Sequence, residues 1–425
     1  MDEPAASRAA TAAATTAAWR HESARLVAAL TRLTRDLGLA EDLAQDALVA
    51  ALEQWPREGI PANPAAWLMT TAKRRAVDHF RRAETQRRKA AQLGRAQEEV
   101  DVPDLDAWVD HIEDDVLRLM FLCCHPALTP PSRAALTLRL VGGLTTAEIA
   151  RGFLVAETTM GQRISRAKRA LAETGAQLDL PTGRQRLARL DDVTAVVYLV
   201  FNEGYAATTG DDWTRPDLCH EAIRLARMLA AMVPDEPETH ALQALLELQA
   251  SRTDARVDPD GTPLLLEQQD RRRWDRLLIR RGLAALERAA RLAAGGRPVG
   301  TYFLQASIAA EHARAARAAD TDWSEIARLY DVLAAVAPGP VVEVNRAVAH
   351  GRAFGPDAGL DVLAALPRDA LAGSPLLPSV RGDLLQRLGR AHQAAQCFRQ
   401  AAAASRNGSE QALLLGRAAA CEASV

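Results

Sequence analysis

Residues 144–171, LTTAEIARGFLVAETTMGQRISRAKRAL, have the pattern of two short helices joined by a tight corner. Thr145 or Thr146 is placed to cap the first helix, and Glu157 or Thr158 opens the second. The apolar residues of the second helix recur at spacings of four, three and four, as a helix with one buried side requires: Met160, Ile164, Ala167 and Leu171. The spacing therefore predicts a helix-turn-helix.

The polar residues of the second helix point away from that buried side. Arginine can bond bidentately to guanine and glutamine to adenine, so such a helix suits the major groove of DNA. The candidate DNA-binding residues are Thr158, Thr159, Gln162, Arg163, Arg166 and Lys168. Spacing alone also fits an ordinary amphipathic helix pair with a solvated basic face, and Leu154 stands where such a corner usually has glycine.

Length and composition predict an all-α protein of two to four domains. The chain has 425 residues, of which 48% are hydrophobic but only 4% aromatic, and alanine is abundant. Such a composition favours helices packed closely through small side chains over sheets. The net charge of -2 excludes a generally basic nucleic-acid coat, so a DNA-binding surface must be local.

The five cysteines are odd in number and have no regular spacing, which argues against a disulfide framework. No run approaches the roughly 20 apolar residues of a membrane span. Residues 1–18, rich in Ala and Thr, lack the pattern of a signal peptide and are expected to form a flexible tail. We expect a cytoplasmic protein without membrane contact. Cys123, Cys124 and His125 are adjacent, which favours core packing over a metal site.

A second basic segment is expected on the helix that starts near Pro64. Residues 64–89, PAAWLMTTAKRRAVDHFRRAETQRRK, contain many Lys and Arg residues, with only Asp78 and Glu84 as acids. That balance suits a phosphate backbone, because each neutralised phosphate releases counterions; a solvated basic helix is the alternative. The helix expected before it, residues 40–55, carries an acidic, polar edge.

Residues 40–55, 64–89 and 144–171, in this order along the chain, resemble three segments of a known family. Trp67-Leu68-Met69, Ala72-Lys73, Ala76-Val77-Asp78 and Arg81-Arg82 are similar to the promoter-melting helix of bacterial sigma factors of the extracytoplasmic function type. Residues 40–55 resemble the part of these factors that grips the clamp helices of RNA polymerase. Residues 144–171 align without a gap with their helix-turn-helix, which reads the minus-thirty-five element.

The resemblance implies partners and site residues. The partners would be core RNA polymerase, through its clamp helices and flap, and promoter DNA. Polymerase contact would come from Asp42, Gln45 and Asp46. Contacts around the minus-ten element would come from Trp67, Lys73, Arg74, Arg75, His79, Arg81 and Arg82, although pattern alone favours a core position for Trp67. No catalytic group, cofactor or metal is required, so the protein would not be an enzyme.

The second half of the chain predicts a helical, tetratricopeptide-like domain. Gly382, Ala394, Phe398 and Ala401 fall at the offsets of such a repeat, and VTAVVYLVFNEGYAAT (193–208) is expected to be a buried helix ending near Gly204. Cys-Cys-His-Pro-Ala-Leu, VFNEGY and GTYFLQASIAAEHARA resemble a subgroup of these sigma factors with a long C-terminal extension. The extension is expected to regulate the sigma factor and to bind a protein or peptide regulator.

The expected domain order is a tail, a polymerase- and minus-ten-binding domain, an acidic linker, a helix-turn-helix domain and a regulatory domain: residues 1–18, 19–92, 93–111, 112–175 and 176–425. A conventional helix-turn-helix regulator with a helical repeat sensor domain is the alternative function. It has no use for the basic helix at 64–89 or the acidic edge at 40–55. A scaffold built on the repeats alone would need neither DNA motif.

Overall fold

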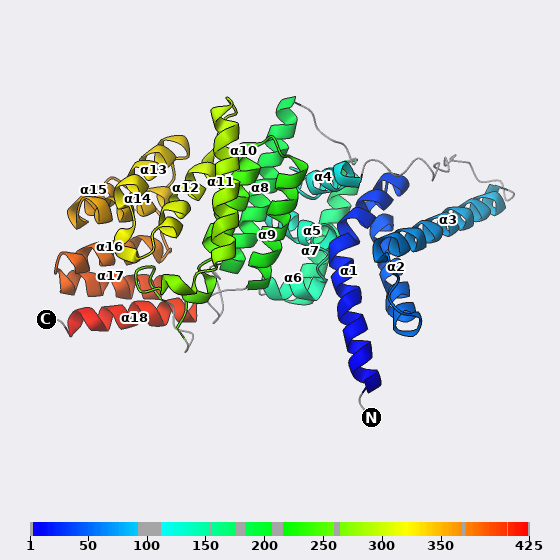
Figure 1. The fold of residues 1–425 in the computed structure, drawn as a ribbon, viewed down its shortest axis with the longest axis horizontal. Helices are drawn as coiled ribbons and strands as arrows, with labels where there is room; N and C mark the ends of the chain where they lie inside the picture. Colours follow the sequence, from blue (N-terminus) through cyan, green and yellow to red (C-terminus); the bar gives the residue numbers. More distant parts are fainter. Residues whose placement is uncertain are drawn as a thin grey trace. The chain divides into compact units, whose positions relative to one another are not determined.

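The computed structural model confirms the all-α prediction over the part of the chain that it describes (Figure 1). No strand occurs among the described residues, which are 3–91, 112–153, 155–175, 183–205, 216–258, 264–367, 370–405 and 407–423. The chain divides into two compact units, Met1–Val196 and Val197–Val425. The expected linker at 93–111 and the corner residue Leu154 lie outside the described residues.

The first unit contains seven helices and the beginning of an eighth among its described residues. They are α1 (Glu3–Thr34), α2 (Leu37–Glu58), α3 (Pro64–Ala91), α4 (Ile112–Cys123), α5 (Pro130–Leu140), α6 (Thr146–Gly152), α7 (Glu157–Glu173) and α8 (Gly183–Tyr205). The structure corrects the flexible tail expected at residues 1–18, because α1 already begins at Glu3. Alanine is the strongest helix former, and Pro4 is tolerated in a first helical turn, where its missing N–H costs no hydrogen bond.

Small apolar residues hold the first three helices together. Ala40, Ala44, Ala47 and Ala51 of α2 are all fully buried. Helix α3 buries Leu68, Ala72 and Ala76 at spacings of four. Alanines on facing surfaces allow close approach of the helix axes, so the core of this bundle needs few aromatic side chains.

The boundary between the two units falls inside α8, after Val196, whereas the sequence places the domain boundary at residue 175. The first part of α8 is bound to the helices that precede it. The Asp192 carboxylate accepts a hydrogen bond from Arg133 of α5 at 2.7 Å, and Arg189 donates to the carbonyl of Phe121 in α4. Helix α8 covers the apolar stretch at 193–205, so the buried helix expected there is confirmed.

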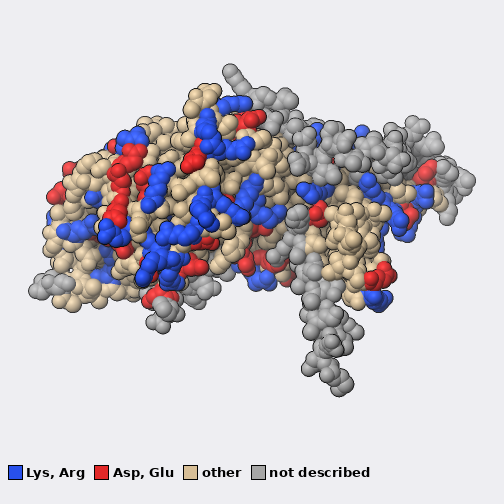
Figure 2. Space-filling view, viewed as in Figure 1, with Lys and Arg blue, Asp and Glu red and all other residues tan. Residues whose placement is uncertain are grey.

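The second unit continues with ten α-helices among its described residues: α9 (Pro216–Met232), α10 (Pro237–Ala250), α11 (Arg276–Ala294), α12 (Thr301–Arg314), α13 (Trp323–Val336), α14 (Pro340–Ala353), α15 (Pro356–Ala364), α16 (Leu376–Arg387), α17 (Ala391–Ala404) and α18 (Gly408–Glu422). Helices that are neighbours in sequence also pack together in space, as in α10 with α11 and α16 with α17. This local order is compatible with a tetratricopeptide-like repeat. Basic and acidic side chains alternate over much of the surface visible in Figure 2.

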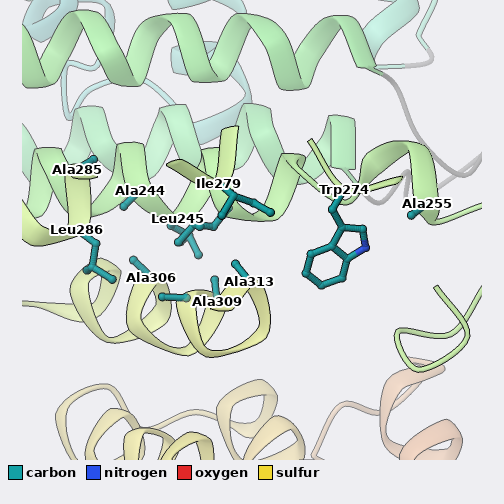
Figure 3. Close-up of a cluster of buried hydrophobic side chains, with 12 residues drawn as sticks. Ala244, Leu245, Ala255, Trp274, Ile279, Ala285, Leu286, Ala306, Ala309 and Ala313 are labelled. Carbon is teal, nitrogen blue, oxygen red and sulfur yellow. The ribbon is translucent and has the colours of Figure 1, made fainter. Parts of the chain in front are cut away.

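Helices α10, α11 and α12 pack through alanines around a small apolar core (Figure 3). Ala244 and Leu245 of α10 face Ile279 and Ala285 of α11, and the indole of Trp274 lies at one end of the cluster. A Cβ atom at Gly282 would lie only 2.7 Å from Leu248 Cγ. This glycine therefore permits the close contact between α10 and α11.

The expected repeat motif occupies α16 and α17. Gly382, Ala394, Phe398 and Ala401 are all buried, and a Cβ at Gly382 would meet the Phe398 ring at 2.7 Å. The aromatic ring thus fills the space that the glycine leaves open between the two helices. Arg417 of α18 lies over the same ring, 4.2 Å from its centroid, and contacts Asp383 of α16 at 2.7 Å.

None of the helices described here is long and apolar enough to cross a membrane.

Candidate nucleic-acid interface

The predicted helix-turn-helix is present as α6 and α7. Thr145 caps α6 in a reciprocal arrangement with Glu148: the hydroxyl accepts from the Glu148 N–H at 3.1 Å, and the carboxylate accepts from the Thr145 N–H at 2.8 Å. Two of the free amide groups at the helix start are thereby satisfied. Helix α7 begins at Glu157, one of the two predicted positions, although its N-cap residue Ala156 makes no side-chain cap hydrogen bond.

Helix α7 buries the four predicted apolar positions, Met160, Ile164, Ala167 and Leu171. Its opposite side forms a shallow depression of about 460 Å³ lined by Thr158, Gly161, Gln162, Ser165, Arg166 and Arg169. Gln162 and Arg166 are exposed and lie four residues apart, so they project from one face. Thr159 is exposed beside them, and Arg163 is half-buried at the margin. This face combines acceptors and donors suited to base edges.

Lys168 differs from the other α7 residues because its ammonium group is engaged within the protein. It forms an ion pair with Glu41 of α2, a carboxylate whose side chain is only 6% exposed. The other oxygen of Glu41 accepts from Arg139 Nε of α5 at 2.7 Å. Glu41 therefore joins α2 to both α5 and α7. In this structure Lys168 serves that junction, whereas Gln162 and Arg166 remain available to a ligand.

A second buried carboxylate makes a similar junction between the predicted domains. Asp115 of α4 has a side chain that is 2% exposed, and it pairs with Arg32 of α1 at 3.4 Å and Arg118 at 3.3 Å. The side chains of Arg32 and Arg118 are also partly shielded from water. Two buried carboxylates thus connect residues 19–92 to residues 112–175 within the first unit.

The basic helix α3 exposes most of the residues assigned to the minus-ten element. Arg74 and Arg81 lie seven residues apart and share one exposed face, with Arg82 exposed beside it. His79 is also exposed, and its ring contacts that of Phe80 at a centroid distance of 5.9 Å. Lys73 and Arg75 are half-buried on the flanks. The face therefore offers a row of guanidinium groups to a phosphate backbone.

Trp67 is half-buried at the start of α3. Its ring meets Trp55 of α2 edge to face, with the centroids 5.4 Å apart and the planes at 68°. Aromatic pairs favour this geometry. Trp67 thus helps to fix the N-terminal end of α3 on α2, and the exposed arginines follow later in α3.

The predicted polymerase-binding residues share one face of α2. Asp42 and Asp46 are exposed, four residues apart, and Gln45 is half-buried between them. Asp46 pairs with Arg75 of α3 at 3.2 Å, so one residue assigned to polymerase and one assigned to DNA meet in the structure. Both side chains are at least 40% exposed, which makes the pair weak and easily exchanged for other partners.

The core-packing interpretation of Cys123 and Cys124 is confirmed. Both are fully buried, and Cys124 Sγ lies 3.6 Å from Thr137 Oγ1 of α5. Burial raises the pKa of Cys124 to about 12, so the thiol stays protonated at neutral pH. Among the described residues, no three His, Cys, Asp or Glu side chains converge as a metal ligand set.

The polar end of α8 is satisfied within the second unit. The Tyr205 hydroxyl accepts a hydrogen bond from Arg252 at 2.6 Å, and Arg256 lies over the Tyr205 ring at 3.8 Å. Arg256 also donates to the Tyr205 carbonyl. These contacts favour a helix-capping role for this residue of the VFNEGY motif.

The sequence did not single out Ser165 as part of the α7 depression, or Glu41 and Arg139 as a junction. Helical spacing could have identified Ser165, because it follows Thr158 by seven residues. The ion pairs of Glu41 join residues about a hundred positions apart in the chain. No local pattern in the sequence indicates such a contact.

Comparisons with known families match three segments of the chain. Sigma-70 region 2 matches residues 18–86, which include α2 and most of α3. Sigma-70 region 4 matches residues 118–171, which include α5, α6 and most of α7. A family of unknown function (DUF6596) matches residues 189–290, from α8 into α11.

Several curated proteins are similar to the chain. An uncharacterized protein of Rhizobium meliloti is 44% identical over 394 residues, covering 91% of this chain and 90% of the relative. The ECF RNA polymerase sigma factor SigK of Mycobacterium sp. (strain KMS) is 31% identical over 155 residues, covering 35% of this chain and 75% of the relative. The probable ECF RNA polymerase sigma factor SigI of Mycobacterium tuberculosis is 29% identical over 178 residues, covering 40% and 59%. No solved structure matches the chain significantly.

Proposed function

The chain belongs to the extracytoplasmic function (ECF) RNA polymerase sigma factors, and from this premise we propose how its parts share the work of transcription initiation. As a member of this family it binds core RNA polymerase and promoter DNA and directs initiation. The observation that carries this conclusion is the presence of both sigma-70 regions, in order, on one chain. A conventional operator-binding regulator would need no region 2.

We propose that α7 reads the upstream promoter element in the major groove. Gln162 and Arg166 would contact base edges, and Thr158 and Thr159 would contact bases or phosphates near the start of the helix. Their exposure on one face supports these roles. Arg163 would contact DNA from the margin of this face, and Lys168 would do so only after leaving Glu41.

Helix α3 would contact DNA around the minus-ten element. Arg74, Arg81 and Arg82 would neutralise phosphates, while His79 and Lys73 would flank them. Opening the promoter would flip a base out of the stack of the minus-ten element, which costs a few kcal/mol. The contacts of α3, together with polymerase binding, would offset that cost. The protein would act by binding and would need no catalytic group.

The exposed edge of α2 would contact polymerase. Asp42 and Asp46 would meet basic residues of the clamp helices, and Gln45 would add a hydrogen bond. Since Asp46 already pairs weakly with Arg75, polymerase binding would exchange one ion pair for another and release Arg75 toward DNA. Region 4 would contact the flap. These events would take place in the cytoplasm, where the polymerase acts.

We propose that residues 176–425 regulate the sigma factor. Three observations support a dedicated role: the second unit is compact, a family of unknown function matches residues 189–290, and a relative that is 44% identical aligns over 91% of the chain. The relative named SigK covers only 35% of the chain, as expected if the extension is an addition to the sigma core. A protein or peptide regulator would bind to this extension.

Transcription with purified components tests the regulatory role. The full chain and a chain ending after Tyr205, which keeps all of α8 and its ion pair to α5, are each combined with core polymerase and a cognate promoter. A change in transcript yield in either direction supports regulation by the extension. Equal yields from both chains under all conditions would contradict it.

A further inference from the structure

The second unit contains a groove of about 750 Å³ between α9, α10 and α11 that neither matched sigma-70 region includes. The charged side chains that the described residues contribute to its lining are basic, and Figure 2 shows basic side chains over this part of the unit. Its polar lining residues are Arg227 of α9, His240 and Gln243 of α10, and Arg281, Arg288 and Arg291 of α11. Among the described residues, four arginines and no carboxylate line this groove, on a protein whose net charge is -2.

The arginines differ in how they are held. Arg227 of α9 donates from Nε to Oε1 of Glu247 at 2.6 Å, and that carboxylate is fully buried. Arg227 is thereby fixed in direction, although its side chain is 37% exposed. Arg281, Arg288 and Arg291 of α11 are exposed and form no ion pair with any described residue. Three of the four guanidinium groups are therefore free for an external anion.

The floor of the groove is apolar and nearly neutral. Ala230 and Ala285 are buried, with Ala231 and Ala284 exposed beside them. Burial lowers the pKa of His240, and the nearby Arg288 guanidinium lowers it further, so this imidazole adds no positive charge at neutral pH. The groove combines an alanine strip with a cationic rim.

The spacing of the arginines indicates the size of the anion. Arg281 and Arg291 are ten residues apart on one helix, which places their Cα atoms about 15 Å apart along the axis. One phosphate or carboxylate cannot bridge that distance. Alternate side chains of an extended peptide are about 6.6–6.8 Å apart, so three acidic residues at alternate positions span a similar length.

The part of the chain that the structure describes contributes no Phe, Tyr or Trp side chain to the lining. Single-stranded nucleic acids are usually bound through aromatic side chains on which the bases stack, and such a platform is missing here. The alanine strip instead offers contact to small apolar side chains between the acidic ones.

We propose that this groove binds an extended acidic peptide segment of a partner protein, with alternate Asp or Glu side chains on Arg281, Arg288 and Arg291 of α11. The inference deepens the regulatory role proposed for residues 176–425 and rests on it. All but one of the lining residues fall within 189–290, the segment matched by the family of unknown function. The groove is the place in that segment where a partner's charge is recognised.

Binding of a labelled peptide to the full-length protein tests the proposal. The probe is a fluorescein-labelled 12-residue peptide of alternating Glu and Ala, measured by anisotropy at low salt. Arg281→Glu and Arg288→Glu should each weaken binding by about tenfold or more, because each reverses a charge in the groove. The matched control is Arg280→Glu, which changes the same charge on an exposed position of α11 outside the lining, and it should retain most of the affinity.

Three results would overturn the proposal: no binding of the peptide, equal loss with Arg280→Glu, or no loss with the groove variants. Single-stranded and duplex DNA are run in parallel with the same proteins. Groove-dependent binding of either DNA in place of the peptide would also overturn it and would assign the groove to nucleic acid. Transcription by the full and shortened chains tests the regulatory role of the extension separately from the peptide-binding role of the groove. If their yields differ while the peptide fails to bind, the regulatory role stands and the groove assignment falls.

Discussion

Replacing Glu41 with glutamine should destabilise the first unit, because one buried carboxylate serves two cations. Glu41 is 6% exposed in its side chain, and it binds Arg139 of α5 and Lys168 of α7. Glutamine keeps the volume and one acceptor oxygen but removes the charge. The two cations would then lie close together with no anion between them.

The magnitude follows from the exposure of the cations. Removing one partner of a fully buried ion pair costs about 3–5 kcal/mol, whereas exposed pairs contribute at most about 1 kcal/mol. The side chains of Arg139 and Lys168 are 18% and 26% exposed, so both can turn partly toward water. We therefore expect Glu41→Gln to lower the free energy of unfolding by about 2 kcal/mol, between these limits. For a unit of this size the midpoint should fall by about 4–8 °C.

Calorimetry of the full-length protein measures this midpoint, and hydrogen exchange locates the change. Exchange should accelerate in α5 and α7, which Glu41 joins to α2, and stay unchanged in α16 and α17 of the second unit. Asp42→Asn is the matched control. Asp42 lies next in sequence, is exposed, and makes no ion pair with a described residue, so its loss should change stability by less than about 0.5 kcal/mol.

A thermodynamic cycle with Lys168→Met isolates the pair itself. If Glu41 and Lys168 interact as the structure shows, the effects of the two substitutions should be non-additive by about 1 kcal/mol or more. The reasoning would be refuted by Glu41→Gln unfolding at the same temperature as the wild type, or by strict additivity in the cycle.

Three further predictions concern base contact, packing and pH. Arg166→Ala should weaken binding of polymerase holoenzyme to the upstream element by about 1–3 kcal/mol and relax specificity at one base pair, measured with single-base promoter variants; an unchanged base preference would exclude it as a reading residue. Gly382→Ala should destabilise the second unit by about 1–3 kcal/mol in a denaturation assay, because its methyl group would meet the Phe398 ring. Gly416→Ala, with open space around it in α18, should be neutral or stabilising in the same assay, and equal effects of the two substitutions would contradict the packing account. Burial lowers the pKa of His312 from 6.5 to about 3, so as the pH falls below 6.5 the unfolded chain takes up a proton at this residue while the folded protein does not. Between pH 6.5 and 3, His312 should therefore lower the free energy of unfolding by up to about 1.4 kcal/mol for each unit by which the pH falls. Thermal unfolding at pH 7 and pH 5 should show a smaller loss of stability in His312→Phe than in the wild type, and an identical loss would contradict this assignment.

Local periodicity was sufficient to predict the second helix of the helix-turn-helix. The four apolar positions of α7 were predicted from spacing alone, and all are buried, because a helix surface repeats every 3.6 residues whatever it packs against. The Thr145 cap was likewise predictable, since its partner Glu148 is three residues away. The alanine-rich start of the chain is predicted to be a flexible tail, whereas helix α1 begins at Glu3, as the high helix propensity of alanine favours.

Contacts between distant segments could not be predicted from the sequence. Lys168 was assigned to DNA because it lies in a basic helix, and nothing near it in the chain indicates that Glu41 binds it. The basic groove of the second unit depends on Arg227 and Arg288 coming together from two helices. Such a site depends on how the helices pack, so no regular spacing of residues in the sequence indicates it.

Promoter-directed transcription is the most direct test of the central claim that this chain is a sigma factor. The measurement is run-off transcription with purified core RNA polymerase, the full-length protein and a DNA template carrying its own upstream promoter. We expect a transcript of defined length that requires the protein and is lost when Arg74 and Arg81 of α3 are both replaced by alanine. Absence of any transcript, with the protein binding duplex DNA without polymerase, would contradict the account and favour a conventional helix-turn-helix regulator.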